Sequence, residues 1–287
     1  MDATRADRRR KPAGANRTPA PTRTPPAVVL AAGRGNRLLP LTERIPKCLL
    51  PVGGRSLLEH QLRALQWAGV DRIEIITGHG AERVREVCDG LAGYAHNAQY
   101  ERTNSLDSLA CTTLAPEPDG LLILNSDVLF HPDLLSALLA DPRRNVLLAD
   151  FAATLGEEEM KIRTDGSGRI RAVSKRLSPS AADAENLGLI KLGPPAARAL
   201  IELARRRNRP RGLRWVPDGL HHLRRRFVFH ALPTGDLPWI EIDFPDDLRR
   251  AETVIYPRLS ASLWGQAAFG GEARRASARP GRASMKT

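Results

Sequence analysis

The sequence predicts a three-layer α/β fold. Short apolar runs that read as strands alternate with amphipathic segments that read as helices, which is the pattern of βαβ units. The run at 121–125 is almost wholly apolar, as expected of a strand covered on both faces in a parallel sheet. With 287 residues, 42% of them hydrophobic, the chain can bury the core of one large domain.

The first half of the chain supplies the βαβ pattern. Ser56 is a plausible N-cap for the first long helix and Gly69 a plausible stop. Between these residues, leucines recur on one side at helical spacing. The expected strands are 27–32, 72–77 and 121–125, and the expected helices are 56–69 and 81–88.

The second half of the chain begins with a β-hairpin. Two strand-like segments flank the turn Asp-Gly-Ser-Gly at 165–168. The expected strands are 160–164, 169–174, 186–192, 227–232 and 239–243, and the expected helices are 194–207 and 246–255. One domain over 27–257 is the economical reading.

The net charge of +12 lies mostly at the two ends of the chain. Residues 1–26 hold seven Lys/Arg and two Asp, and residues 258–287 hold six Lys/Arg and one Glu, so each segment carries +5 and the middle only +2. Both ends are poor in large apolar residues, and we expect disordered basic tails. A nucleic-acid-binding protein that uses these tails and the arginine triplets at 205–207 and 224–226 is therefore a minor alternative.

Cysteine content and hydropathy favour a cytoplasmic protein. The three cysteines are odd in number and lack C-x-x-C spacing, so neither a disulfide framework nor a zinc site is indicated. No apolar run reaches the roughly 18 residues that span a bilayer, and no apolar segment follows the N-terminal arginines as in a secretory signal. We expect no membrane association.

The most informative stretch is a glycine loop that follows the first strand. Gly33 and Gly35 leave room for phosphate oxygens against backbone N–H groups, and Arg37 and Lys47 add two cations. Such a loop could be an ordinary turn. It is neither a dinucleotide fingerprint, because Leu38 stands at the third glycine position, nor a Walker A loop, because no Gly-Lys pair occurs.

The segment 30–54, with Pro40-Leu41-Thr42, Pro46-Lys47 and Leu50-Pro51-Val52-Gly53-Gly54, resembles the signature of sugar-phosphate-type nucleotidyltransferases. That resemblance implies a Rossmann-like mixed sheet of the nucleotide-diphospho-sugar transferase type, with the hairpin region receiving an acceptor. It implies Arg37 and Lys47 as catalytic residues. It also implies a nucleotide site formed by Leu30, Ala32, Gly33, Gly35 and Arg37.

Two carboxylates follow the ends of apolar strands. Asp127 and Asp243 are expected at the crevice where α/β sheets bind ligands. A Mg²⁺ ion that bridges phosphates takes one or two carboxylates. The resemblance gives both residues this role, through the late segment Trp239-Ile240-Glu241-Ile242-Asp243. Otherwise, Asp243 would be only a helix N-cap.

The segments 97–100 and 103–109 resemble those of bacterial phosphocholine and phosphonate cytidylyltransferases. This branch implies CTP as donor, with Asn104 and Ser105 near the nucleotide, although either residue could simply cap a helix. It also implies four residues at the acceptor. These are Lys161, Lys175, Glu185 and Asp218.

The expected reaction transfers CMP from CTP to a small phosphonate or a phosphocholine-like acceptor and releases pyrophosphate. A sugar-1-phosphate nucleotidyltransferase that uses another NTP is the alternative within the same superfamily. A catalytically inactive relative is disfavoured, because Gly33, Arg37, Lys47, Asp127 and Asp243 are all present. The choice of acceptor stays open, as does a homo-oligomeric state.

Overall fold

The structure, a computed structural model, describes residues 23–261. Most of the two expected basic tails, residues 1–22 and 262–287, lies outside this range. Within it, no helix combines the length and the apolar character that crossing a membrane requires.

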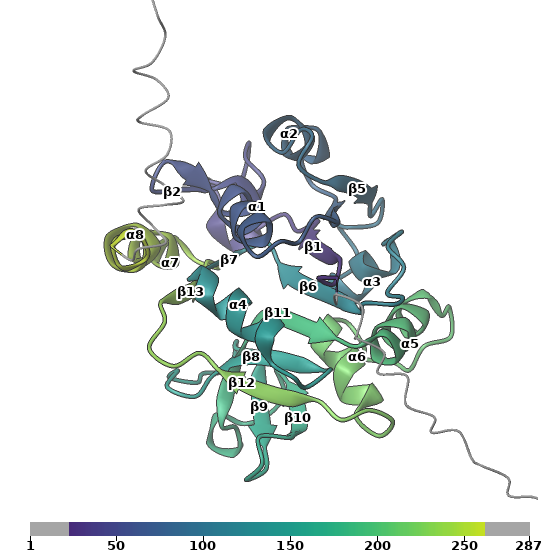
Figure 1. The fold of residues 1–287 in the computed structure, drawn as a ribbon. Helices are drawn as coiled ribbons and strands as arrows, with labels where there is room; N and C mark the ends of the chain where they lie inside the picture. The colour runs from purple at the N-terminus through teal and green to yellow at the C-terminus, as the bar shows by residue number, and fades with distance from the viewer. Residues whose placement is uncertain (1–22, 262–287) are drawn as a thin grey trace, which may run out of the picture.

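A nine-stranded mixed sheet forms the centre of the molecule (Figure 1). β5, β4, β1 and β6 run parallel to one another, and β11 is antiparallel to β6. Beyond β11 the sheet divides, because one part of β11 pairs with β9 and another with β8. The strands are β1 (Ala27–Ala31), β4 (Ile73–Thr77), β5 (Gly93–His96), β6 (Leu121–Asn125), β8 (Val146–Asp150), β9 (Lys161–Thr164), β10 (Ile170–Ser174), β11 (Ala184–Leu192) and β12 (His230–Pro233).

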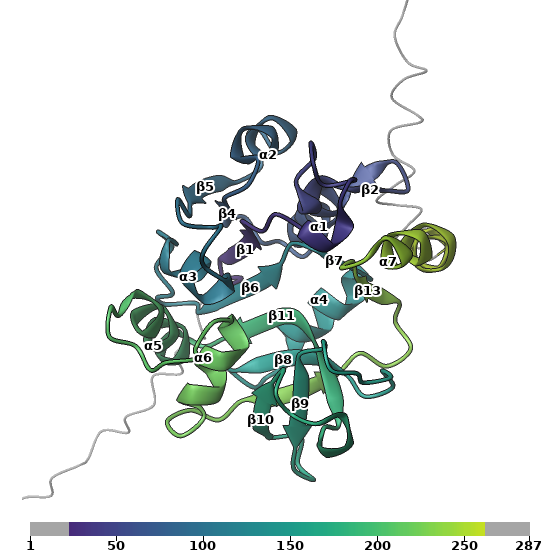
Figure 2. The same cartoon turned by 180° about the vertical axis from the view of Figure 1, so that it is seen from behind.

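Helices cover both faces of this sheet, which confirms the predicted three-layer α/β class. Figures 1 and 2 show α3, α5 and α6 on one side of the central strands and α1 on the other. The helices are α1 (Leu57–Trp67), α2 (Ala81–Val87), α3 (Ser105–Ala110), α4 (Pro132–Ala140), α5 (Pro194–Arg205), α6 (Val216–Leu223), α7 (Pro245–Arg250) and α8 (Tyr256–Ser260), with a π-helical turn, η4 (Ala251–Ile255), between the last two.

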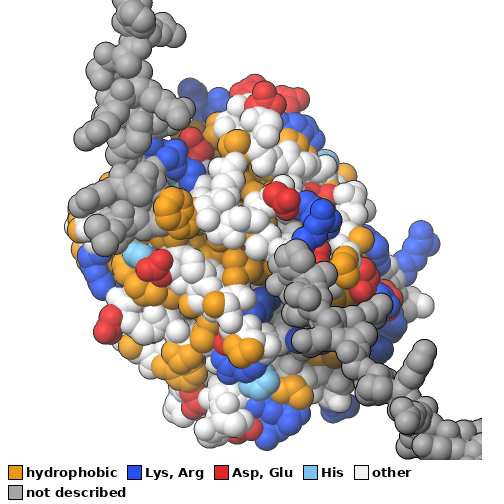
Figure 3. Space-filling view, viewed as in Figure 1, with side chains coloured by type: hydrophobic (Ala, Val, Ile, Leu, Met, Phe, Trp, Pro, Cys, Tyr) orange, Lys and Arg blue, Asp and Glu red, His pale blue; other side chains and the backbone are white. Residues whose placement is uncertain are grey.

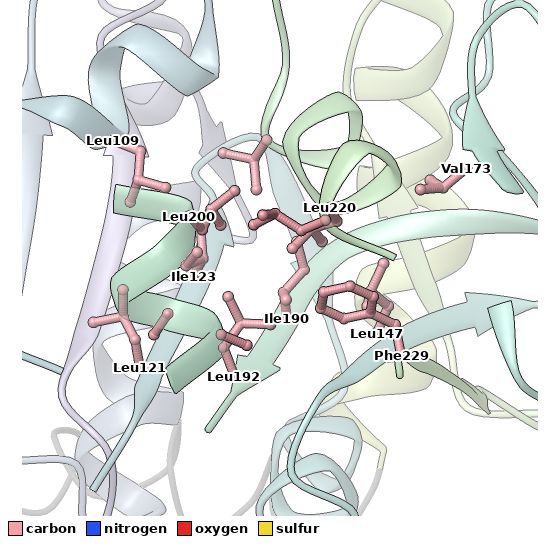
Figure 4. Packing of buried hydrophobic residues seen from close by; sticks show 14 of the residues in the cluster. Leu109, Leu121, Ile123, Leu147, Val173, Ile190, Leu192, Leu200, Leu220 and Phe229 are labelled. Carbon is pink, nitrogen blue, oxygen red and sulfur yellow. The ribbon is translucent and has the colours of Figure 1, made fainter. Parts of the chain in front are cut away.

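Two apolar cores follow from these layers. On one face, Leu109 of α3 and Leu200 of α5 pack with Ile123 of β6 in the cluster drawn in Figure 4. On the other face, α1 and α4 pack against alternate residues of β1, β4 and β6. Because successive side chains of a strand point to opposite faces, the same strands contribute residues to both cores.

The start of α1 shows how local sequence fixes an element. The Ser56 Oγ accepts a hydrogen bond from the Glu59 N–H (3.2 Å), and the Glu59 carboxylate accepts one from the Ser56 N–H (2.8 Å). This reciprocal capping box confirms the predicted N-cap. Gly69, with φ of 74°, follows the end of the helix as expected.

A third, smaller core carries the end of the domain. β7 (Val128–Phe130) pairs antiparallel with β13 (Trp239–Glu241), and β2 (Pro51–Val52) forms a hairpin with β3 (Arg55–Ser56) that contributes Val52 to the same core. Apolar residues of β7 and β13 pack with η4 and α8. The β7–β13 pairing places the late Trp-Ile-Glu-Ile-Asp segment beside the end of β6, where Asp127 lies.

Candidate active site

A cavity of about 460 Å³ lies at the carboxyl ends of β1 and β6, and Asn186 of β11 also contributes to its wall. Ligands of open α/β sheets bind at this edge. Most of the residues that the sequence predicted for the site line this cavity. They are Leu30, Ala32, Gly33, Gly35, Arg37, Lys47, Asn104, Ser105, Asp127, Lys175 and Asp243.

The glycine loop is shaped by Gly35. Its φ of 68° lies in the left-handed region, and an added Cβ would come within 2.9 Å of the Lys47 Cβ. The Thr42 hydroxyl donates to the Gly35 carbonyl (2.8 Å) and closes the turn. Around Gly33 a Cβ would meet no atom within 4 Å, so the backbone there is open to a ligand.

Three carboxylates converge on the cavity floor. The Ile242 N–H donates to the Asp127 carbonyl (3.0 Å), which extends the β7–β13 ladder and brings Asp127 beside Asp243. One oxygen atom from each of Asp127, Glu241 and Asp243 lies within 4.8 Å of the others. The sequence analysis did not assign Glu241. It stands two residues before Asp243, and strand side chains two residues apart share a face.

Two cations hold these carboxylates. The Lys47 Nζ lies 2.6 Å from the Asp127 Oδ2 and 2.5 Å from the Asp243 Oδ1. The Arg37 guanidinium lies 2.6 Å from the Asp243 Oδ2. Arg37 also donates to Glu158 (3.3 Å) and lies over the Phe244 ring, 4.9 Å from its centroid.

Burial and charge act in opposite directions in this group. Burial alone would lower the pKa of Lys47, but Asp127 and Asp243 outweigh it and raise that pKa. Burial likewise would raise the pKa of Asp243, yet Lys47 and Arg37 hold it below its ordinary value. Among the described residues no cation forms an ion pair with Glu241, so burial and the charges of Asp127 and Asp243 outweigh the opposing charge of Lys47 and raise the pKa of Glu241 well above the usual range.

The carboxylate group fits a hard divalent cation such as Mg²⁺. Its ligand atoms are all oxygens, which Mg²⁺ prefers. The Asp127 Oδ1 is buried and makes no hydrogen bond to any described residue. The Lys47 ammonium already stands between two of the carboxylates as a stand-in cation.

The opposite wall of the cavity combines a cation, an indole and an amide. The Lys175 Nζ lies 5.5 Å from the centroid of the Trp215 ring, within cation–π range. Asn186 is 4% exposed, and its Oδ1 has no hydrogen-bond partner among the described residues. Ser105, at the start of α3, accepts a hydrogen bond from the Val216 N–H (3.0 Å), which ties α3 to α6.

The structure does not bring three of the four predicted acceptor residues, Lys161, Asp218 and Glu185, to the cavity wall. Lys161 is fully buried, and its Nζ donates to the carbonyls of Gly156 (2.8 Å), Glu157 (3.0 Å) and Glu159 (3.2 Å). An ammonium satisfied in this way has no donor left for an acceptor phosphate. Lys161 therefore holds the 156–159 loop instead.

Asp218 is likewise occupied by the backbone. Its Oδ2 accepts hydrogen bonds from the N–H groups of Arg214 (2.9 Å) and Trp215 (3.0 Å). The carboxylate thus caps the start of α6. A helix with Pro217 in its first turn and an acidic residue next to it is the sequence signal for this role.

Glu185 lies outside the cavity wall, next to Asn186. Its carboxylate makes no hydrogen bond or ion pair with any described residue. Burial, followed by the charges of Glu159, Asp150, Asp243 and Asp247, raises the pKa of Glu185 to about 7. A carboxylate with several like neighbours and no cation gives this end of the site a negative potential.

Arginines of the two basic triplets are engaged in the fold. Arg205 donates to the carbonyls of Ala110 (3.1 Å) and Thr112 (2.6 Å), and Arg224 donates to that of Arg171 (3.0 Å). On the face in Figure 3, basic side chains of the described residues lie at several separated places, with acidic and apolar ones between them. This distribution does not favour a nucleic-acid surface there.

Residues 27–157 match the model of the MobA-like NTP transferase domain. This part of the chain is similar to the MobA-like NTP transferase family. This confirms the nucleotidyltransferase resemblance at the level of the family. The domain supplies the glycine loop, Arg37, Lys47 and Asp127, whereas Glu241 and Asp243 lie beyond the matched range.

Two curated relatives are similar to the chain. It is 33% identical over 259 residues to the CMP-5'-(3-aminopropyl)phosphonate synthase of Streptomyces rubellomurinus, covering 83% of this chain and 41% of the relative. It is 26% identical over 182 residues to the CTP:phosphoglutamine cytidylyltransferase of Campylobacter jejuni, covering 59% and 66%. The chain thus spans less than two thirds of either relative.

A solved structure supports the fold class. The inositol-1-phosphate CTP transferase from T. maritima superposes with a TM-score of 0.67 at 20% identity, over 84% of this chain and 98% of the other. At that identity the match shows the fold alone. The roles of the individual site residues stay predictions.

Proposed function

We propose that the protein is a nucleotidyltransferase that moves CMP from CTP to a small phosphonate or phosphocholine-like acceptor and releases pyrophosphate. The observation that carries this proposal is the group of three carboxylates and two cations facing an open glycine loop in one cavity. Transfer between phosphates needs neutralisation of crowded negative charge and alignment of the reacting groups, and this group supplies both.

The reaction needs no general base in this arrangement. An anionic oxygen of the acceptor attacks the α-phosphorus in line, a new P–O bond forms, and the bond to the β-phosphate breaks with release of pyrophosphate. Arg37 and the backbone N–H groups of Gly33 and Gly35 are positioned to hold the leaving pyrophosphate, and Lys47 to bridge donor and acceptor. A Mg²⁺ ion held by Asp127, Glu241 and Asp243 would supply further neutralisation of the phosphate oxygens.

CTP is the donor that the relatives favour. The names of both curated relatives describe CMP or CTP chemistry, and the aligned segment of the first covers most of this chain. Asn104 and Ser105 line the cavity on the side of α3, beside Tyr100 and Thr103, and we assign this wall to the nucleoside.

The class of acceptor is inferred from the charges at the end of the cavity away from the proposed nucleoside wall. Lys175 lines the cavity and is suited to a phosphonate or phosphate group. Glu185 adds an uncompensated carboxylate beside that wall, with Glu159 and Asp150 near it. A small acceptor with an anionic phosphonate at one end and an ammonium at the other matches both charges, and the name of the first relative describes such a compound.

A substrate panel tests this proposal. Pyrophosphate release is measured for each of the four NTPs against 3-aminopropylphosphonate, phosphocholine, glucose-1-phosphate and propylphosphonate, which lacks the amine. We expect turnover with CTP and the acceptors that carry a cationic nitrogen, 3-aminopropylphosphonate and phosphocholine, and weaker but measurable turnover with CTP and propylphosphonate. Turnover with UTP or dTTP and glucose-1-phosphate instead would replace the proposal with sugar-1-phosphate transfer.

The role of Glu185 is tested with the matched pair of phosphonates. Glu185→Gln should raise KM for 3-aminopropylphosphonate and leave KM for propylphosphonate unchanged, because only the first compound offers a cation to the carboxylate. An equal effect on both acceptors would mean that Glu185 does not contribute charge to acceptor binding.

A further inference from the structure

The Lys47 ammonium lies among the oxygens that a divalent cation would need. Its Nζ contacts the Asp127 Oδ2 at 2.6 Å and the Asp243 Oδ1 at 2.5 Å, and the Lys47 side chain is only 12% exposed. Mg²⁺ binds carboxylate oxygens at about 2.1 Å. An ammonium and a metal ion cannot both be held so closely by the same pair of oxygens, because the two cations would repel each other at short range.

The main chain at Lys47 is anchored by its neighbours, whereas the Lys47 side chain has rotatable bonds that can carry its ammonium to a new position. Lys47 begins the short helix η2 (Lys47–Leu49), in which Cys48 and Leu49 are anchored in the apolar core. Beyond the backbone, a lysine has a flexible four-carbon stem. The Lys47 Cβ lies against Gly35, so this stem begins beside the loop proposed to bind phosphates. The ammonium can therefore exchange carboxylates for phosphate oxygens without any movement of the main chain.

We propose that Lys47 is a resident counter-ion that occupies the metal position in the nucleotide-free protein and yields it when the metal arrives with the nucleotide. This inference rests on the metal site of the proposed function. It makes Lys47 a competitor of the metal as well as a ligand of the phosphates. The free protein then binds metal weakly, and nucleotide strengthens metal binding by giving the ammonium a new partner.

The other cations near the group do not fill this position. Of the three carboxylates, Arg37 contacts only that of Asp243, through the Oδ2, and the Arg37 side chain is 41% exposed. Lys175 contributes charge to Asp243 from a distance, and its ammonium lies over the Trp215 ring instead. Lys175 is therefore a matched control, a lysine in the same cavity that does not contact the carboxylates directly.

The test is metal binding without catalysis. Mn²⁺ is titrated into the nucleotide-free protein, and free Mn²⁺ is followed by electron paramagnetic resonance. Lys47→Met should bind Mn²⁺ about tenfold more tightly than the wild type, which is within the usual range of coupling between two sites. Lys175→Met should change the affinity much less, and a non-hydrolysable CTP analogue should strengthen Mn²⁺ binding more in the wild type than in Lys47→Met.

Thermal denaturation supplies a second readout. Without metal, Lys47→Met leaves the carboxylates without their close cation, so its Tm should lie below that of the wild type, and Mn²⁺ should restore it. If Lys47→Met does not fold, Lys47→Gln replaces it in both measurements. Unchanged or weaker Mn²⁺ binding in the folded variant, or no binding in any protein, would overturn the inference.

Failure of this inference can be distinguished from failure of the proposed function. A wild-type protein that transfers CMP while its Lys47→Met variant gains no Mn²⁺ affinity refutes the exchange alone. A protein that shows the gain but does not use CTP refutes the assigned reaction and leaves the exchange standing.

Discussion

Replacing Glu185 by Gln should stabilise the metal-free protein by an amount that grows from about pH 4.5 upward and is largest above about pH 7. The Glu185 pKa is raised from its ordinary value of 4.5 to about 7, first by burial and then by Glu159, Asp150, Asp243 and Asp247. Between these two pH values the folded protein retains a proton that the unfolded chain has lost, so stability falls as the pH rises. Gln has no proton to lose.

The size of the effect follows from the shift. At about 1.4 kcal/mol for each pKa unit, a change from 4.5 to about 7 corresponds to about 3 kcal/mol once Glu185 is fully ionised. For a domain of this size that amounts to roughly 6 to 12 °C in Tm. Toward pH 4.5 the Glu185 side chain becomes protonated in the unfolded chain as well as in the folded protein, so the difference between Glu185→Gln and wild type should shrink, and it should vanish below that pH.

The assay is thermal or urea denaturation in a chelator at a series of pH values between about 5 and 8.5. Glu74→Gln is the matched control, because the Glu74 carboxylate accepts hydrogen bonds from Thr112 (Oγ1, 2.5 Å) and from the Thr113 N–H (3.0 Å). That variant should be less stable than wild type at every pH. Loss of stability in Glu185→Gln at about pH 8, or a gain that does not depend on pH, would refute the electrostatic reasoning.

Three further predictions follow from the site geometry. Arg37→Ala should remove most turnover with little change in Tm, measured by pyrophosphate release and thermal melting, because the side chain is 41% exposed; near-normal kcat would remove Arg37 from the mechanism. Lys161→Met should lower the free energy of unfolding by about 2 kcal/mol or more in urea denaturation, because three carbonyls of the 156–159 loop lose their donor; an unchanged value would contradict its structural role. Asp127→Asn and Asp243→Asn should each raise the Mg²⁺ concentration for half-maximal activity, with the double variant little worse than the worse single one; unchanged metal dependence of Asp243→Asn would leave Asp243 with no metal role.

Much of the fold could be predicted because its signals are local. The first strand, the capping box of α1 and the alternation of strands and helices are encoded within short windows of sequence. The carboxylates at strand ends were also found, since Asp127 and Asp243 each follow an apolar run. That they lie together depends on the antiparallel pairing of β7 with β13, which spans more than a hundred residues of chain.

Other parts depend on tertiary contacts. The short apolar strand β8 was not predicted from the sequence. The helices α3, α4 and α6 were not predicted either, because so short a helix gives only a weak hydrophobic periodicity. The strand expected at 227–232 appears as β12 (His230–Pro233), because Phe229 packs in the core before the strand begins. The helix expected at 246–255 starts at Pro245, passes into the π-helical η4 and continues to Ser260.

Lys161 and Asp218 were predicted to bind the acceptor, but both side chains bond backbone groups of the protein instead. A lysine in a strand, such as Lys161, looks like a ligand or a solvent-facing residue until the loop that surrounds its ammonium is seen. Asp218 could have been recognised as a cap from its position in the first turn of a helix. Glu241 could have been found from the period-two relation to Asp243, a signal that was present in the sequence and was not used.

The central claim is that this cavity directs cleavage between the α- and β-phosphates and captures the nucleotidyl group. Phosphorus-31 NMR of a reaction with CTP, Mg²⁺ and 3-aminopropylphosphonate tests it directly, because the spectrum distinguishes the phosphorus-containing products. The account predicts equal amounts of pyrophosphate and a CMP–phosphonate anhydride. Formation of CDP and orthophosphate, or pyrophosphate with free CMP and no conjugate, would contradict it.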